Sequence, residues 1–158
     1  MIELRTATSD DQPGIIALID AVFREYDDQI WLEGCDADLA DLDGNYFRPG
    51  GHFWVLDDAG RIVGSHAALP TETPGVCTFR RLYLAAALRG AGWGDRLMQH
   101  NLDWARQQGF RRVEFWSDTR FARAHEFFQR LGFQRGAAIR DVHDGWQPFQ
   151  EYFFWLDL

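Results

Sequence analysis

Three glycines within five residues, between a strand-like and a helix-like segment, constrain this fold more than any other sequence feature. Residues 76–84 are rich in strand formers, and residues 97–105 carry apolar side chains at helical spacing. The junction between them is Arg89-Gly90-Ala91-Gly92-Trp93-Gly94. Because glycine has no Cβ, bare amides at a helix N-terminus can approach an anion closely. The junction predicts a pyrophosphate site, with Arg89 adding a charge-assisted contact. A tight turn without a ligand is the alternative.

Two common nucleotide-binding motifs are absent from this junction. No Gly-Lys-Ser/Thr follows the glycines, so the segment is not the phosphate loop of an ATPase. The glycine spacing departs from Gly-x-Gly-x-x-Gly, and no acidic residue closes a following strand in the expected way. A dinucleotide-binding fold is therefore not expected.

The other apolar patterns predict an α/β (α+β) chain with the order β-α-α-β-β-β-α-β-α-β-β. Residues 2–6 alternate as a short strand, and Ser9 or Asp10 can cap the helix that follows. A weaker helix is expected over residues 36–47. Later strands and helices are expected at residues 52–56, 61–69, 76–84, 97–107, 113–115, 121–131, from 133, and at 152–156. This order predicts a mixed sheet with helices packed on it.

Length and composition narrow the class of protein. The 158 residues predict one domain over 1–158, and 46% apolar residues suffice for a core. No apolar run approaches the roughly 20 residues of a membrane span, and residues 1–5 lack the pattern of a secretory signal. Cys35 and Cys77 are too few for a disulfide scaffold, so a cytoplasmic location is expected. The five histidines show no metal-ligand spacing, so no metal site is expected.

Charge is divided unevenly along the chain. The net charge of −8 argues against nucleic-acid binding, which needs a basic footprint. Residues 1–78 hold 15 acids and 4 arginines, whereas residues 79–158 hold 9 acids and 12 arginines. The chain has no lysine, which we attribute to compositional bias. The split suggests two kinds of ligand chemistry within one domain.

Two motifs of this sequence resemble the GCN5-related N-acetyltransferase (GNAT) family. The family signature Arg/Gln-x-x-Gly-x-Gly/Ala is matched by residues 89–94. The family block Ala-x-x-Phe/Leu-Tyr-x-x-x-Gly-Phe is matched by Ala124-His125-Glu126-Phe127-Phe128-Gln129-Arg130-Leu131-Gly132-Phe133. The motifs cover about residues 78–135, and the first 75 residues match in element order alone. The resemblance implies a mixed, mostly antiparallel sheet of six to seven strands flanked by about four helices.

The resemblance also implies that acetyl-CoA, or another acyl-CoA, is the cosubstrate and lies between the fourth and fifth strands. In the family, fourth-strand backbone groups bind the pantetheine arm and the reacting carbonyl, and Leu82, Tyr83 and Leu84 match that position. The glycine junction would take the pyrophosphate, and Phe121 and Phe128 are expected to contact the cofactor. The amine acceptor would attack directly, without a covalent acyl-enzyme.

Both residues that usually move protons in the family are replaced here. The usual fourth-strand glutamate corresponds to Thr78, and the usual tyrosine of the second block corresponds to Phe128; Phe121 replaces an asparagine. Asp118 and His125 are the candidate catalytic residues, because one ends the fifth strand and the other titrates in a useful range. A helix N-cap for Asp118 and a structural helix histidine for His125 are the alternatives.

The acidic first half bears on the acceptor, because in the family this region walls the acceptor site. Eight acids fall within 19 residues with no basic residue between them: Glu25, Asp27, Asp28, Glu33, Asp36, Asp38, Asp41 and Asp43. Such a surface would steer a cationic acceptor, such as a polyamine, an amino sugar or a basic peptide terminus. A solvated acidic surface would give the same counts.

The sequence therefore predicts an N-acetyltransferase that acts on a primary amine of a small, cationic acceptor. A catalytically silent domain that binds or senses acetyl-CoA is the alternative, motivated by Thr78 and Phe128. No nucleic-acid or membrane partner is expected. The aromatic residues 152–155 predict a strand buried on both faces, or else an exposed edge through which a homodimer could pair.

Overall fold

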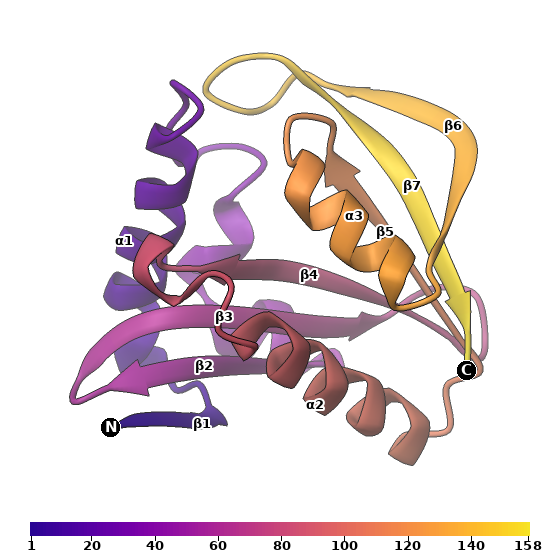
Figure 1. Cartoon of the computed structure of the whole chain (residues 1–158), viewed down its shortest axis with the longest axis horizontal. Helices are drawn as coiled ribbons and strands as arrows, with labels where there is room; N and C mark the ends of the chain where they lie inside the picture. The colour runs from indigo at the N-terminus through magenta and orange to yellow at the C-terminus, as the bar shows by residue number, and fades with distance from the viewer.

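Seven strands form one mixed sheet in the computed structural model, which describes residues 1–158 (Figure 1). Their spatial order is β1-β2-β3-β4-β5-β7-β6, and every neighbouring pair is antiparallel except β4 and β5. The expected fold class is confirmed. The strand bounds are β1 (Ile2–Thr6), β2 (His52–Asp58), β3 (Arg61–Pro70), β4 (Val76–Leu84), β5 (Arg112–Asp118), β6 (Gln134–Val142) and β7 (Phe149–Asp157).

Three α-helices pack on the sheet, and none has the length and apolar character that a membrane crossing requires. The helix expected after the first strand begins at Gln12, with Pro13 in its first turn, where proline loses no hydrogen bond. Ser9 and Asp10 do not cap it, because they lie in a separate 3-10 turn. The bounds are η1 (Ser9–Asp11), α1 (Gln12–Arg24), α2 (Trp93–Gln107) and α3 (Ala122–Arg130).

The weaker helix expected over residues 36–47 is wrong as a continuous element. Two short turns replace it, the 3-10 turn η2 (Ala37–Ala40) and the π turn η3 (Asp43–Phe47). Asp41 between them takes an extended conformation, which ends the first turn. A further 3-10 turn, η4 (Ala86–Leu88), follows β4.

The two faces of the sheet carry different helices, as the alternation of side chains along β2 shows. Trp54 and Leu56 pack into the core beneath α2 and α3, whereas Phe53 and Val55 pack into the core beneath α1, η2 and η3. In Figure 1, α2 and α3 lie on the near side of the sheet. The sheet therefore has two faces, which we call the α2/α3 side and the α1 side.

The parallel pairing of β4 with β5 covers only three residue pairs, from Val76–Arg112 to Thr78–Glu114. Both strands continue beyond it, β4 to Leu84 and β5 to Asp118. The register between β4 and β3 also shifts near Arg81, whose φ of 61° marks a bulge. The outer part of β4 therefore has a hydrogen-bonded neighbour on the β3 side only.

Arg81, at this bulge, is the centre of a buried ion-pair network. Its side chain is 7% exposed, and its guanidinium binds Asp36 at 2.8 Å, Asp38 at 2.5 Å and the carbonyl of Cys35 at 3.2 Å. Burial acts to raise the pKa of Asp38, but the charge and hydrogen bonds of Arg81 outweigh it and hold that pKa below its usual value. The network fixes η2 against β4.

Ion pairs of this kind join the acidic first half to the basic second half. Four of the eight acids between residues 25 and 43 pair with arginines of residues 79–158. The pairs are Glu25–Arg89, Asp28–Arg120, Asp36–Arg81 and Asp38–Arg81. Asp43 also pairs with Arg48, so five of the eight acids form ion pairs within the protein.

Residues 152–155 lie in a strand, β7, that is neither a sheet edge nor buried on both faces, so both alternatives for its surroundings are wrong. β7 hydrogen-bonds β5 on one side and β6 on the other, so the edges are β1 and β6. Phe154 is the one buried residue of β7, and the others remain partly accessible. An interface between two copies would therefore not use β7 as its pairing strand.

We expect Arg81→Met to lower the free energy of unfolding by about 3–5 kcal/mol, because it leaves two buried carboxylates without their cation. Because the pKa of Asp38 is lower in the folded than in the unfolded protein, this ion pair stabilises the fold above the unfolded pKa of 3.8. The stabilisation is lost as the pH falls through the folded pKa. Urea unfolding at pH 7 and below pH 4 measures both effects.

Arg61→Met is the matched control, since Arg61 is exposed and forms no ion pair. Its effect should stay within about 0.5 kcal/mol. Equal losses for the two variants, or a gap between wild type and Arg81→Met that persists at low pH, would contradict the network's role.

Candidate active site

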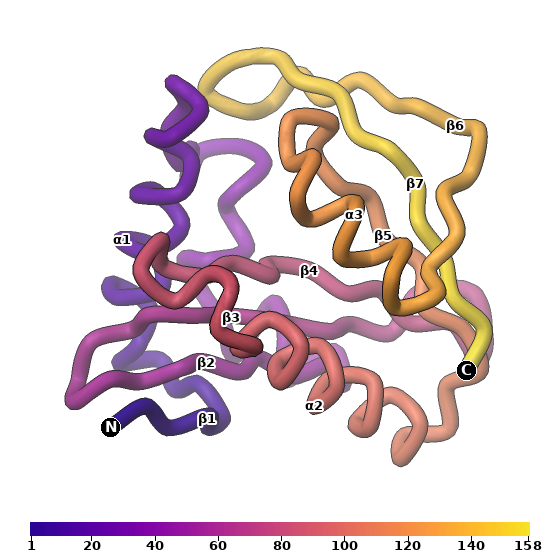
Figure 2. Tube along the Cα trace, viewed as in Figure 1, coloured from indigo at the N-terminus to yellow at the C-terminus, as the bar shows by residue number.

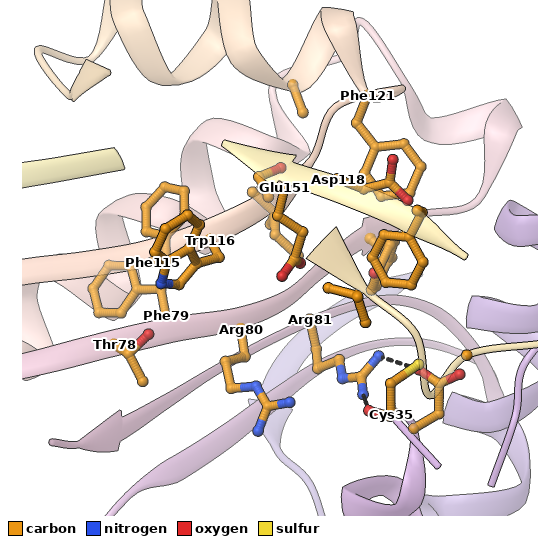
Figure 3. A pocket seen from close by; sticks show the side chains of 18 of the residues that line it. Cys35, Thr78, Phe79, Arg80, Arg81, Phe115, Trp116, Asp118, Phe121 and Glu151 are labelled. Atoms are coloured by element: carbon orange, nitrogen blue, oxygen red, sulfur yellow. Dashed lines mark hydrogen bonds and ion pairs between the residues drawn. The ribbon is translucent and has the colours of Figure 1, made fainter. Parts of the chain in front are cut away.

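The larger cavity, about 710 Å³, lies where β4 and β5 diverge (Figure 3). Seven carboxylates and four arginines are among its lining residues, so its charged lining is net negative. The loop between β6 and β7 reaches the segment after α1, as Figure 2 shows, and Cys35 donates its backbone N–H to the carbonyl of Asp144 at 2.9 Å. The lining from the central strands includes Thr78, Arg80, Arg81, Tyr83, Glu114, Trp116, Asp118, Glu151 and Phe153.

A second cavity, about 540 Å³, lies between the N-terminus of α2, α3 and the end of β4. Four residues line both cavities: Leu82, Tyr83, Phe121 and Ala124. The rings of Tyr83 and Phe121 meet edge to face there, with their centroids 6.2 Å apart. The two cavities therefore adjoin at the gap between β4 and β5.

The glycine junction forms one end of the second cavity. Gly90 and Gly92 have φ of 80° and 86°, a conformation that other residues adopt only with strain. Gly92 precedes the first residue of α2 and no side chain caps that helix, so its first amides have no protein partner from a cap. A Cβ at either glycine would meet no other atom within 4 Å, which shows that the space beside the amides is open. This cradle fits a phosphate group.

Most of the predicted cofactor-binding residues line this second cavity: Leu82, Tyr83, Leu84, Arg89, Gly90, Gly92, Gly94 and Phe121. Ala91 and Trp93 do not line it; the Trp93 ring instead lies 4.2 Å beneath the guanidinium of Arg96. Phe128 lines the larger cavity and packs against Phe115. The local sequence pattern thus located the cavity, although not every residue beside it.

The cations of the second cavity differ from the expected set. Arg89 lines it, but Glu25 holds both of its terminal nitrogens at 2.6 and 2.7 Å. Arg123 and Arg130 on α3 also line the cavity, and neither forms an ion pair. Their separation of seven residues, two helical turns, was the sequence signal for this shared face. They add positive charge where the glycine amides face the cavity.

Asp118 is buried at the end of β5 and lines the larger cavity. Its carboxylate accepts the backbone N–H of Arg120 and binds the guanidinium of the same residue at 2.6 Å. It does not cap α3, whose N-cap position is Phe121 without a side-chain hydrogen bond. Glu151 was not singled out by the sequence analysis. It lies opposite Asp118 in the register of β5 and β7, and its carboxylate binds Arg140 at 2.7 Å.

His125 is buried on α3 and does not line either cavity directly. Its Nε2 lies 3.1 Å from Oγ of Ser117, and Ser117 lines the larger cavity. Burial lowers the pKa of His125 below 6.5 and the charge of Arg135 lowers it further, although the backbone and carboxylate of Asp118 oppose this shift. His125 is thus neutral at pH 7 and connected to the cavity through a hydroxyl.

A family model described as "Acetyltransferase (GNAT) family" matches residues 16–133. The chain belongs to this family. Its sequence is 28% identical over 136 residues to the uncharacterized N-acetyltransferase YjgM of Escherichia coli K12, covering 83% of the chain and 81% of that protein. It is 34% identical over 103 residues to N-acetyltransferase family 8 member 2 of Rattus norvegicus, covering 63% of the chain and 46% of that protein.

Solved structures agree with the GNAT assignment at the level of fold. The chain superposes on a GNAT-family acetyltransferase of Staphylococcus aureus Mu50 with a TM-score of 0.87 at 17% identity, covering 100% and 99% of the two chains. An acetyltransferase of Streptococcus agalactiae 2603 gives 0.84 at 18% identity, covering 99% and 98%. Membership of the GNAT family places the chain among acyl-CoA-dependent acetyltransferases. The chain spans less than half the length of the rat relative.

We expect Gly92→Ala to weaken acetyl-CoA binding about tenfold or more, because a Cβ enters the space beside the α2 amides. Gly60→Ala is the matched control: Gly60 also has a left-handed φ, of 93°, and open space around its Cβ position, but lies in the β2–β3 turn. Calorimetric titration measures affinity, and thermal unfolding should show similar strain in both variants. Equal affinity of Gly92→Ala and wild type would contradict the cradle.

Proposed function

We propose that this protein transfers the acetyl group of acetyl-CoA to a primary amine of a small acceptor by direct attack. The observation that carries the proposal is the meeting of two chemically different cavities at the β4–β5 gap, on Leu82, Tyr83, Phe121 and Ala124. The second cavity has the glycine cradle for phosphate, and the larger cavity has the net-negative charged lining. Their junction is where an acyl donor and an amine would come into contact.

The cofactor side uses backbone and arginine groups. Beyond Thr78 the outer part of β4 has no hydrogen-bonded neighbour on the β5 side, so the backbone of Leu82, Tyr83 and Leu84 can bind an amide-containing arm. Donors in that position can also stabilise charge on a thioester oxygen. Gly90 and Gly92 would hold the pyrophosphate, and the α3 arginines would lie beside the phosphates.

The chemical step needs one base and one proton return. The neutral amine attacks the thioester carbonyl carbon, the C–S bond breaks, and the leaving CoA thiolate takes up the proton that the amine nitrogen loses as it becomes an amide. Before attack, the acceptor ammonium must lose a proton. Ser117 and His125 form a route for it: Ser117 lines the cavity, and the neutral imidazole 3.1 Å from its hydroxyl can accept the proton.

Asp118 is the second candidate for this role, because its carboxylate lines the acceptor cavity directly. Its ion pairs with Arg120 keep it oriented, and Glu151 lies opposite it on β7. Two neighbouring carboxylates in a net-negative cavity favour a positively charged acceptor, which supports a small cationic amine as the substrate.

We also propose that the protein works in the cytoplasm. Cys35 and Cys77 are free thiols, as expected in a reducing compartment. A homodimer remains a prediction, and the molecular mass in analytical ultracentrifugation would test it.

Release of the CoA thiol tests the function. The wild type should release thiol with at least one member of a panel of primary amines, such as spermidine, glucosamine, phenethylamine and amino-acid amides. The acetylated amine should appear by mass spectrometry in equal amount. Tight binding of acetyl-CoA without amine-dependent release would instead establish a binding domain and overturn the proposal.

The acidic limb of the kcat/KM profile should lie below pH 6.5, because the pKa of His125 is lowered and its neutral form accepts the proton. His125→Gln should remove that limb and reduce kcat by about 10²-fold, and Ser117→Ala should do the same. His100→Gln is the control, since His100 is exposed on α2. Loss of the limb in Asp118→Asn, but not in His125→Gln, would assign proton transfer to Asp118.

A further inference from the structure

The arginines that line the acceptor cavity differ in whether they have a partner. Arg81, Arg120 and Arg140 each bind a carboxylate at 2.8 Å or less. Arg80 makes no hydrogen bond, and its one ionic contact is Asp38 at 3.8 Å, beyond hydrogen-bonding range. In Figure 3 Arg80 and Arg81 lie side by side, and the dashed lines reach Arg81 only. Arg80 is therefore a cation of the cavity with unused donors.

The charge of Arg80 adds to that of Arg81 in lowering the pKa of Asp38, but Arg80 donates no hydrogen bond to that carboxylate. Both oxygens of Asp38 already accept hydrogen bonds, from Arg81 and from the hydroxyl of Tyr46. Both oxygens of Asp36 are also occupied. The hydrogen bonds of the buried network are thus complete without Arg80, whose side chain is 38% exposed. Five N–H donors arranged as a fork remain free to meet a planar anion.

The position of Arg80 assigns it to the acceptor and not to the cofactor. Phe79 packs into the α2 core, so its neighbour Arg80 points to the opposite, α1 side of the sheet. The glycine cradle and the second cavity do not include it. Arg80 precedes Tyr83 at the cavity junction by three residues, which is roughly 10 Å along a strand. That distance leaves room for an acceptor whose amine reaches the junction while its other end contacts Arg80.

We propose that Arg80 determines specificity by binding a carboxylate of the acceptor, so that the substrate carries both a primary amine and a carboxylate. This inference rests on the proposed function and makes it narrower. The ammonium end would lie near Asp118 and Glu151, and the carboxylate end would lie against the guanidinium of Arg80. Separate sites for opposite charges would orient such an acceptor with its amine toward the thioester.

Paired acceptors test the inference. L-phenylalanine, 4-aminobutyrate and 6-aminohexanoate are each compared with the corresponding amide, and thiol release gives kcat/KM. The wild type should prefer at least one carboxylate to its amide by about tenfold or more. Arg80→Gln should abolish that preference, so that the carboxylate and its amide give similar kcat/KM values, and Arg80→Lys should retain part of it. Arg61→Gln, at an exposed site outside both cavities, should behave as wild type.

A binding measurement separates this inference from the proposed function. N-acetyl-L-phenylalanine and its amide are titrated by calorimetry into the CoA-loaded wild type and into Arg80→Gln. Tighter binding of the carboxylate by wild type alone supports the role of Arg80 even if no amine releases thiol, in which case the proposed function fails by itself. The absence of any carboxylate preference in both measurements, including a failure to bind, overturns the inference.

Discussion

β4 and β5 are hydrogen-bonded over three residue pairs and then separate, although each strand continues for several residues. In a regular parallel pair the ladder would go on and close the sheet. Here the separation leaves strand backbone without a partner in the middle of the molecule, and unpaired backbone groups favour a ligand that can satisfy them. The same separation lets a cavity on the α1 side meet a cavity on the α2/α3 side. The bulge at Arg81, held by buried carboxylates of the 36–38 segment, keeps β4 in this bent path.

Paired charges define the acceptor cavity as much as its shape does. Arginine suits these pairs because its planar fork can bind two carboxylates at once, as Arg120 does with Asp28 and Asp118. Most of the acidic residues between positions 25 and 43 are thereby held in ion pairs within the protein. A bound acceptor therefore meets a surface whose charges are already oriented, and the few groups without a partner carry the discrimination between ligands.

Local patterns predicted much of this molecule, and long-range pairing produced what they missed. The glycine junction, the helix at α3 and the order of elements could be predicted, because each depends on residues close together in the chain. Glu151 could not, because it reaches the site only when β7 inserts between β5 and β6. The ion pairs of the acidic run could not be predicted for the same reason, since partners such as Asp28 and Arg120 are 92 residues apart. The helix expected over 36–47 failed because its aspartates bind distant arginines and the chain is extended at Asp41.

Every cationic side chain in this protein is an arginine, in the buried pairs and around both cavities alike. A guanidinium keeps its proton at all physiological pH values, so it has no free electron pair with which to attack a thioester. Lysine in the same places could lose its proton when desolvated and become a nucleophile. The cationic groups around a reactive acyl donor are thus ones that the donor does not acylate, and the incoming acceptor meets no competing lysine amine within the site.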